Sequence, residues 1–358
     1  MVSSLHESFL QLVRLGIGAS NNATISKDID WEKLKALADG QGLSAIILDG
    51  IGHLPDGQRP PQILLLEWIG ETLQEESVFA TQQKEAAKMA ELFHQNHIRT
   101  YVLKGTVVAE CYPKPNHRVS VDVDCFLLPD KGDFDAWTLG NDLIVSKGYE
   151  VSKDFYKNST FLLPVLTVES HQYLTPFRGN NNLKALEKVF QTLLCKDKGE
   201  DRFEETWLYR PPVMVSALFL IEHAYSHFLH EGLTWRMVLD WVMFRKKHKD
   251  EINWGEFDAF IDEFGFWKFY ESFSRLGQYL MGEFQDSGFT FQEKRMLADV
   301  WAPLDVHETV RGVKGKLALV GNTWRARWKY RYFTGMSWVT ALRIQVRGFL
   351  FEKNPTLN

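Results

Sequence analysis

Two aspartates stand inside a run that otherwise has the composition of a buried strand. Asp122 and Asp124 lie one residue apart in VSVDVDCFLL, residues 119–128. Side chains at positions i and i+2 of a strand point to the same face, so the two carboxylates share one face, and Val123 and Cys125 share the other. Two unpaired anions this close repel each other, and each raises the pKa of the other. A chain that folds this way must therefore bring positive charge to that face.

That positive charge has two candidate sources. A divalent cation would keep both carboxylates ionised, and hard oxygen ligands suit Mg²⁺, or Mn²⁺ in its place. The alternative is an ion pair, for which Arg118 and Lys104 are the nearest basic residues in the sequence. The aspartate pair alone does not choose between the two, because acidic residues on strand faces are often paired with basic side chains or solvated.

The residues upstream add a candidate phosphate cradle. Gly105 follows the short strand TYVLKG and opens a helix, so backbone N–H groups at that turn can face a phosphate. Thr106 adds a hydroxyl to the turn, and Lys104 adds a positive charge.

A later strand, LTVESHQYL, supplies a third carboxylate, Glu169, two residues before His171 on the same face. A two-metal phosphoryl-transfer site needs several carboxylates and a place for the phosphates. We therefore expect Glu169 to lie on a strand next to Asp122 and Asp124, with His171 at the edge of the pocket. A histidine buried and hydrogen-bonded in the core remains the alternative for His171.

The periodicity of the chain predicts an α+β protein in three parts. Residues 1–98 are expected to be helical, with one helix capped by Asp30 and ended by Gly40 or Gly42, and a long helix opened by Pro60 and Pro61. Residues 99–182 alternate strands and helices and predict a small mixed sheet. Residues 183–358 return to a helical pattern.

Charge is unevenly distributed along the chain. The net charge is -5, but the segment from residue 311 to the C-terminus holds ten Lys/Arg and one acid, which leaves -14 for the remainder. Such a basic tail can bind an anionic partner or dock on the acidic body of its own chain, and we favour docking. The N-terminus lacks a basic start and a long apolar run, and no apolar segment approaches the ~20 residues that span a bilayer, so we expect a cytoplasmic protein.

The segment around the aspartates resembles the DNA polymerase β-type nucleotidyltransferase superfamily, and more closely a bacterial family of uncharacterised nucleotidyltransferases. The resemblance is carried by Leu103-Lys104-Gly105, by Tyr112-Pro113-Lys114-Pro115 with Arg118, by Asp122-Val123-Asp124, and by Glu169-Ser170-His171. It extends weakly into the helical flanks on both sides. The chain departs from the superfamily pattern at the turn, where Gly-Thr replaces Gly-Gly or Gly-Ser, and at the third acid, which is often Asp.

The resemblance implies an enzyme that transfers a nucleoside monophosphate from an NTP to a hydroxyl acceptor and releases pyrophosphate. It implies that Asp122, Asp124 and Glu169 hold Mg²⁺ or Mn²⁺ and are catalytic. Lys104, Gly105 and Thr106 would then hold the triphosphate, and Arg118 either helps them or pairs with Glu110. Two different classes remain as alternatives: a catalytically idle nucleotide-sensing module, and a nucleic-acid binder that uses the basic tail.

The stretch EHAYSHFLH places His223, His227 and His230 on one face of a helix. A zinc site is not favoured because no fourth ligand is evident. We expect His223 and His227 to form a polar stripe that faces the acceptor pocket. Arg236 and Asp240, four residues apart, are expected to form an ordinary helix pair.

Overall fold

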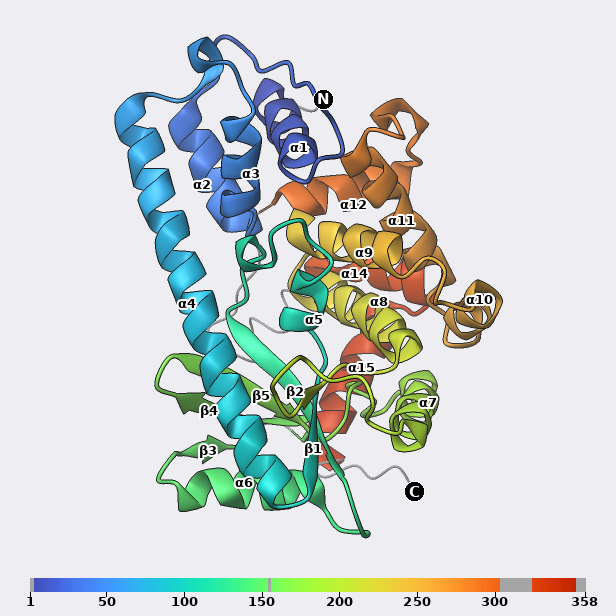
Figure 1. Cartoon of the computed structure of the whole chain (residues 1–358). Helices are drawn as coiled ribbons and strands as arrows, with labels where there is room; N and C mark the ends of the chain where they lie inside the picture. Colours follow the sequence, from blue (N-terminus) through green and yellow to red (C-terminus); the bar gives the residue numbers. More distant parts are fainter. Residues whose placement is uncertain (1–2, 154–155, 303–323, 352–358) are drawn as a thin grey trace.

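The computed structural model describes residues 3–153, 156–302 and 324–351 and shows an α+β protein with one small mixed sheet between helical regions (Figure 1). The predicted fold class is confirmed. The principal helices before the last strand are α1 (Ser4–Gly16), α2 (Trp31–Gln41), α3 (Ser44–Gly52), α4 (Gln62–Gln95), α5 (Thr106–Ala109), α6 (Ala136–Ser146) and α7 (Asn181–Lys196). After it come α8 (Val213–His230), α9 (Trp235–Lys247), α10 (Trp254–Glu263), α11 (Trp267–Met281), α12 (Phe291–Trp301), α14 (Arg327–Lys329) and α15 (Trp338–Phe351).

The N-terminal helices begin and end where their capping residues predict. The Asp30 side chain accepts a hydrogen bond from the backbone N–H of Lys33, and Gly42 ends α2 in the left-handed conformation at φ 66°. Helix α4 starts directly after Pro61 and runs for 34 residues. Figure 1 shows α4 passing from the N-terminal helices down to the sheet, so one rigid helix connects the two regions.

The sheet has six strands in the order β3-β4-β5-β2-β1-β6. The strands are β1 (Ile98–Val102), β2 (Asp122–Pro129), β3 (Val151–Ser152), β4 (Asn158–Leu163), β5 (Leu166–His171) and β6 (Leu208–Tyr209). Strands β2 and β5 run parallel, with Asp124 opposite Glu169, whereas β1–β2 and β4–β5 are antiparallel. The two-residue strand β6 pairs in parallel with β1 from within a stretch for which the sequence predicts only helix.

The two faces of the sheet have different chemistry. Val123, Cys125 and Leu127 of β2 are buried in a cluster that also contains Phe93 of α4 and Ile144 of α6. By the alternation of a strand, the aspartates of β2 lie on the opposite face. Helix α8 contacts this second face through Phe219, which lies against the ring of His171, and through His223, which lies near Lys104.

The described part of the basic tail packs into the protein body. Lys329 is 7% exposed, and its ammonium lies 2.7 Å from Asp299 Oδ1 and donates to the carbonyl of Phe228 at 2.7 Å. Phe333 is buried, and its ring contacts those of Phe228 and Phe269. This part of the tail therefore packs into the protein body through the ion pair of Lys329 and the ring of Phe333. The other described basic side chains of the tail are exposed (Arg325, Arg327, Arg331 and Arg343). The rest lie outside the described residues or have no described side chain (Arg311, Lys314, Lys316, Arg347 and Lys353).

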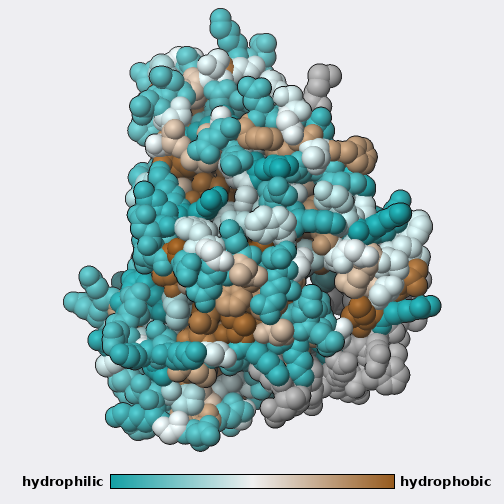
Figure 2. Space-filling view, turned by 90° about the vertical axis from the view of Figure 1, so that its right-hand side faces the viewer, coloured by the Kyte–Doolittle hydropathy of each residue, from teal (hydrophilic) through white to brown (hydrophobic). Residues whose placement is uncertain are grey.

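The face turned to the viewer in Figure 2 is mostly hydrophilic, with small separate apolar patches. No helix in the described part of the chain is long and apolar enough to cross a membrane. The division of the chain at residues 98 and 182 into three domains stays a prediction.

The contact of Phe333 with Phe228 and Phe269 predicts a stability effect. Phe333→Ala should lower the free energy of unfolding by about 3–5 kcal/mol, because it removes a buried ring and leaves a cavity. Urea denaturation followed by tryptophan fluorescence measures this change. Arg331→Ala, at an exposed position two residues earlier, is the control and should change stability by less than about 0.5 kcal/mol. Equal stability of the two variants would show that the tail does not belong to the core.

Candidate active site

The carboxylates predicted to form the site converge at one end of β2 and β5. Asp124 and Glu169 are Cα partners in the parallel pair, and ligand atoms of Asp124, Glu169 and His171 all lie within 4.8 Å of one another. The predicted geometry of Glu169, on a neighbouring strand and the same face, is confirmed. Asp122 begins β2 two residues before Asp124 and stands outside this tight group.

Asp124 is the buried centre of the group. It is 2% exposed, its Oδ1 lies 3.0 Å from His171 Nε2, and its Oδ2 lies 3.0 Å from Lys104 Nζ. Burial alone would raise the pKa of Asp124, but Lys104 and His171 outweigh it and hold the pKa well below its usual range. The ion-pair alternative for Asp124 is therefore present in the structure, and Lys104 is the partner.

One oxygen of Asp124 keeps a lone pair available. Although Oδ2 is close to the ammonium of Lys104, the contact lacks hydrogen-bond geometry, and Oδ2 is a buried oxygen without a hydrogen bond. A buried carboxylate oxygen in this condition, beside a second carboxylate, suits a hard cation. Both ring nitrogens of His171 face oxygens: Nε2 faces Oδ1 of Asp124, and Nδ1 faces the carbonyl oxygen of Tyr173 at 3.3 Å. The ring therefore acts as a hydrogen-bond donor that orients Asp124.

Glu169 is the accessible member of the group. Its side chain is 35% exposed, against 3% for that of Asp124. Asn158 of β4 donates to Glu169 Oε2 at 2.9 Å and holds the carboxylate in place. Burial and the charge of Asp124 raise the pKa of Glu169, which makes it a better proton acceptor than a solvated carboxylate. Asn158 was not predicted, because only the pairing of β4 with β5 brings it here.

His171 is buried rather than at the pocket edge. It is 2% exposed, and Asp124 and the ring of Phe219 enclose it. The expectation of an edge position was wrong because α8 covers this end of the sheet.

Helix α8 brings His223 to the site. His223 Nε2 lies 3.2 Å from Lys104 Nζ, and burial, followed by the charge of Lys104, lowers the pKa of His223 well below its usual range. The neutral ring can then accept a hydrogen bond from the ammonium. His227 lies one turn further along α8 and pairs with Glu231 at 2.9 Å, and its ring is tilted by 56° against that of His223 with 4.4 Å between the ring centroids. Among the described residues, neither histidine belongs to a metal-type cluster.

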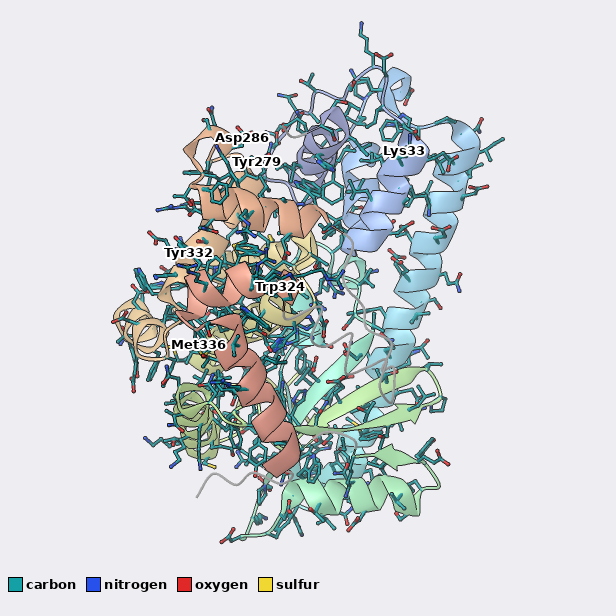
Figure 3. All side chains as sticks on the ribbon, turned by 180° about the vertical axis from the view of Figure 1, so that it is seen from behind. Lys33, Tyr279, Asp286, Trp324, Tyr332 and Met336 are labelled. Carbon is teal, nitrogen blue, oxygen red and sulfur yellow. The ribbon has the colours of Figure 1, made fainter. Side chains whose placement is uncertain are left out.

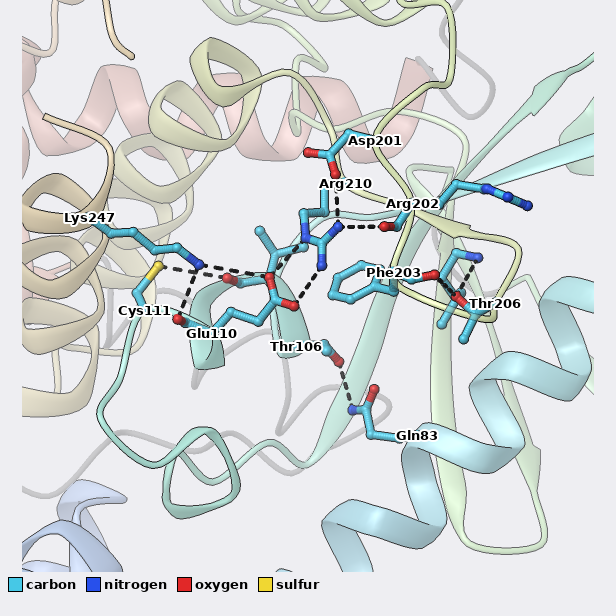
Figure 4. Close-up of polar contacts among 12 residues, drawn as sticks. Gln83, Thr106, Glu110, Cys111, Asp201, Arg202, Phe203, Thr206, Arg210 and Lys247 are labelled. Atoms are coloured by element: carbon cyan, nitrogen blue, oxygen red, sulfur yellow. Dashed lines mark hydrogen bonds and ion pairs between the residues drawn. The ribbon is translucent and has the colours of Figure 1, made fainter. Parts of the chain in front are cut away.

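The turn after β1 joins a strand to a helix through Gly105, as the sequence predicts, and its use as a phosphate cradle stays a prediction. Gly105 has φ 67° and ψ -106° and precedes the four-residue helix α5. A Cβ at Gly105 would lie 3.1 Å from Ser120 Oγ, so any side chain there would strain the backbone and crowd the turn. The hydroxyl of Thr106 accepts a hydrogen bond from Gln83 of α4 at 2.7 Å (Figure 4).

Arg118 does not face the site. Its guanidinium is 2% exposed and binds Asp240 of α9 through two hydrogen bonds, Nε at 3.0 Å and Nη2 at 2.7 Å. Tyr112 donates to the same carboxylate at 2.7 Å. The expected pair of Arg118 with Glu110 was wrong because Glu110 binds Arg210 at 2.7 and 2.8 Å (Figure 4).

Arg118 and Tyr112 thus fasten the loop before β2 to α9. The expected pair of Arg236 with Asp240 is replaced by this contact, and Arg236 instead donates to the carbonyl of Val119 at 2.7 Å. Both arginines hold residues 118–119, which lead into Asp122. In the structure both arginines therefore fix the segment that precedes the aspartates, and binding of phosphate by Arg118 stays a prediction.

A second buried carboxyl lies near the site on α8. Glu222 is 1% exposed and lines a cavity that Tyr156, just before β4, also lines. Burial raises the pKa of Glu222 to about 7, against the lowering effect of Lys157. The sequence carries a signal for this residue, since Glu222 directly follows the apolar run SALFLI.

The comparisons with known proteins identify the family. A family model described as "Uncharacterised nucleotidyltransferase" matches residues 27–282, well over half of the 358 residues. The chain belongs to this family. No curated protein and no solved structure matches the chain.

The unequal burial of the two aspartates predicts unequal effects of neutralising them. Asp124→Asn should lower the free energy of unfolding by about 3 kcal/mol, because Lys104, only 14% exposed, would lose its anionic partner. Asp122→Asn is the matched control, since Asp122 is half-buried, and it should leave stability equal or slightly higher. Thermal and urea denaturation measure both. A greater loss of stability with Asp122→Asn would contradict this assignment of the ion pair.

The raised pKa of Glu222 predicts a pH-dependent stability. The unfolded carboxyl titrates near ~4.3 and the folded one near 7, so the native state binds more protons between these values and loses stability as pH rises through that window. As the pH rises from 5 to 8, the free energy of unfolding of Glu222→Gln should therefore increase by about 2–3 kcal/mol relative to that of the wild type. Urea denaturation at the two pH values measures this gain. A stability difference that does not change with pH would show that Glu222 is ionised when folded.

Proposed function

We propose, on the premise that the chain belongs to the uncharacterised nucleotidyltransferase family, that it transfers a nucleoside monophosphate from an NTP to a hydroxyl acceptor and releases pyrophosphate. The observation that supports this most directly is the convergence of Asp124 and Glu169 on one sheet face, next to the Gly105 turn. We place the family in the DNA polymerase β-type superfamily, supported by the order of a strand, a glycine turn, the D-x-D strand and a third acid. A bacterial, cytoplasmic enzyme is part of the same proposal.

The donor set fits a divalent cation. Asp124 Oδ2 lacks a hydrogen bond, and the Glu169 carboxylate is accessible beside it, with Asp122 at the start of the same strand. These three residues would hold Mg²⁺ or Mn²⁺. The ion, when bound, supplies charge stabilisation for the phosphates and lowers the pKa of an attacking hydroxyl.

The ammonium of Lys104 has two interaction partners in this proposal, Asp124 and the triphosphate. In the structure its ammonium neutralises Asp124 and contacts His223. Because Gly105 is the next residue, the same ammonium can turn to a β- or γ-phosphate held by the backbone of the Gly105–Thr106 turn. Lys104 would then balance Asp124 in the empty enzyme and the triphosphate in the loaded one.

Glu169 is the residue that we assign to proton transfer. Its raised pKa and exposure suit it to accept the proton of the acceptor hydroxyl as the hydroxyl oxygen bonds to the α-phosphorus. The bond from the α-phosphorus to the pyrophosphate oxygen breaks in the same displacement, and pyrophosphate leaves with its electron pair.

The test is a transfer assay with α-labelled NTPs, Mg²⁺ or Mn²⁺, and a cell extract as the source of acceptors. The wild type should transfer label to a discrete species, and Asp122→Asn and Glu169→Gln should reduce transfer to background. Asp133→Asn, which alters an exposed carboxylate beyond the far end of β2, should transfer label like the wild type. Label transfer that survives in both site variants would refute the three-carboxylate proposal.

The idle nucleotide sensor is the second candidate, and one observation favours it: the Lys104–Asp124 pair already neutralises the site without a metal. Binding of Mg–NTP to the wild type with no labelled product from any extract would select the sensor. For the nucleic-acid binder, Lys329 and Phe333 of the tail pack into the protein body, while Arg325, Arg327, Arg331 and Arg343 are exposed. No observation favours this class over the other two.

A further inference from the structure

A cavity of about 290 Å³ lies beside the candidate active site, between the start of β4, helices α7 and α8, and the C-terminal segment that contains α15. Figure 3 shows Met336, one of its lining residues, just before α15, and α15 running from there toward the sheet. Most of the lining is apolar or aromatic, with Tyr156, Tyr225, Leu229 and Ile344 as examples. Such a lining suits a ring-bearing molecule.

Glu222 is the acidic residue among the described residues of this lining, which also includes the basic side chains of Arg178 and His230. Glu222 is 1% exposed, and among the described residues no hydrogen bond or ion pair of its carboxylate is found, although the charge of Lys157 acts on it. A buried carboxyl without a partner destabilises the fold, because the desolvation of the group is not repaid by hydrogen bonds. Glu187, a second buried acid in this region, accepts hydrogen bonds from the backbone of Leu174 and Thr175 and from Gln191. This contrast between Glu187 and Glu222 supports a ligand-binding role for Glu222.

The cavity lies on one particular side of the candidate site. Tyr156 stands two residues before Asn158, which holds Glu169, and Glu222 stands next to His223, which contacts Lys104. In the sheet, β5 and then β4 lie on one side of β2. Strand β1, which leads into the Gly105 turn, lies on the other side of β2. The cavity and the phosphate turn are therefore on opposite sides of the carboxylates.

The geometry of phosphoryl transfer relates the position of the cavity to the direction from which the acceptor attacks. In phosphoryl transfer the attacking and leaving oxygens lie roughly in line on opposite sides of phosphorus. With the leaving pyrophosphate at the Gly105 turn, the acceptor hydroxyl must approach from the side of Glu169 and β4. That is the side on which the cavity lies.

We propose that this cavity binds the acceptor, and that the acceptor has an apolar ring body and a nitrogen group, cationic amine or N–H, that donates to Glu222. This proposal rests on the proposed function for the direction of attack, but the chemistry of the cavity is independent of it. A second pocket, of about 430 Å³, is lined by Asp39, Glu71 and Glu75 together with Arg118 and Ser120, and Glu169 is not among its lining residues.

The experiment compares two small probes of matched size. Tyramine carries an aromatic ring and a cationic amine, and tyrosol carries a hydroxyl in place of that amine. Saturation-transfer NMR without nucleotide measures the affinity of each probe for the full-length protein. The variants are Glu222→Gln, which removes the charge, and Ser226→Phe, which fills the cavity from α8. The control is Glu231→Gln, which removes an exposed carboxylate at the end of the same helix.

Tyramine should bind the wild type and Glu231→Gln about tenfold more tightly than tyrosol, the effect of one charged hydrogen bond. Glu222→Gln should reduce that preference to less than about twofold, and Ser226→Phe should abolish binding of both probes. A thermal melt of each variant confirms that it is folded. Equal affinity for both probes, or no binding of either at millimolar concentration, would overturn the proposal.

Calorimetry with Mg–ATP and Mg–GTP separates the acceptor from the base of the nucleotide, which also carries N–H groups. Glu222→Gln and Ser226→Phe should bind both nucleotides like the wild type. Weaker nucleotide binding in these variants would overturn the assignment to the acceptor and give the cavity to the nucleobase. Because the probe measurements require no turnover, their failure is distinct from a failure of the carboxylate variants in the transfer assay.

Discussion

The parallel pairing of β2 with β5 is the constraint on which the candidate site depends. Its register sets Asp124 opposite Glu169, although the two are 45 residues apart in the chain. A shift of this register by one residue would turn Glu169 to the opposite face and bury it among the apolar residues under α4 and α6. The buried charge of Asp124 is tolerated because Lys104 and His171 surround it. The pairing of β2 with β5 thus buries the carboxylate of Asp124, and Lys104 and His171 stabilise that pairing by neutralising the carboxylate.

The loop before β2 is the second part of this arrangement. Arg118 and Tyr112 share the carboxylate of Asp240, and Arg236 holds the carbonyl of Val119, so helix α9 fixes the segment that ends at Asp122. Arg118 resembles a phosphate ligand in the sequence, yet in the structure it is buried and bound to Asp240. The site is thus built on two layers: strands that carry the carboxylates, and a helical region that holds the strand ends. Helix α8 joins the two by bringing His223 to Lys104 and Glu222 to the neighbouring cavity.

The sequence predicted the features that local chemistry determines. The cap at Asp30, the start of α4 after Pro61, the strand with alternating aspartates and the face of Glu169 all follow from turn residues and a period of two. It failed where a partner comes from a distant element. Arg118 was assigned to phosphate or Glu110 because nothing local points to Asp240, 122 residues away. Strand β6 is two residues long and carries too little pattern to detect, and the burial of His171 depends on α8 packing over the sheet.

In the proposed mechanism, Lys104 neutralises Asp124 in the empty enzyme. When a metal–nucleotide complex binds at Asp124 and Glu169, the ammonium of Lys104 moves from Asp124 to the triphosphate. A crystal structure with Mn²⁺ and a non-hydrolysable NTP, with manganese located by its anomalous scattering, tests this most directly. The mechanism predicts manganese between the Asp124 and Glu169 carboxylates, and Lys104 Nζ moved from Asp124 onto a phosphate at the Gly105 turn. Manganese elsewhere, or Lys104 still paired with Asp124 while the triphosphate binds at another place, would contradict it.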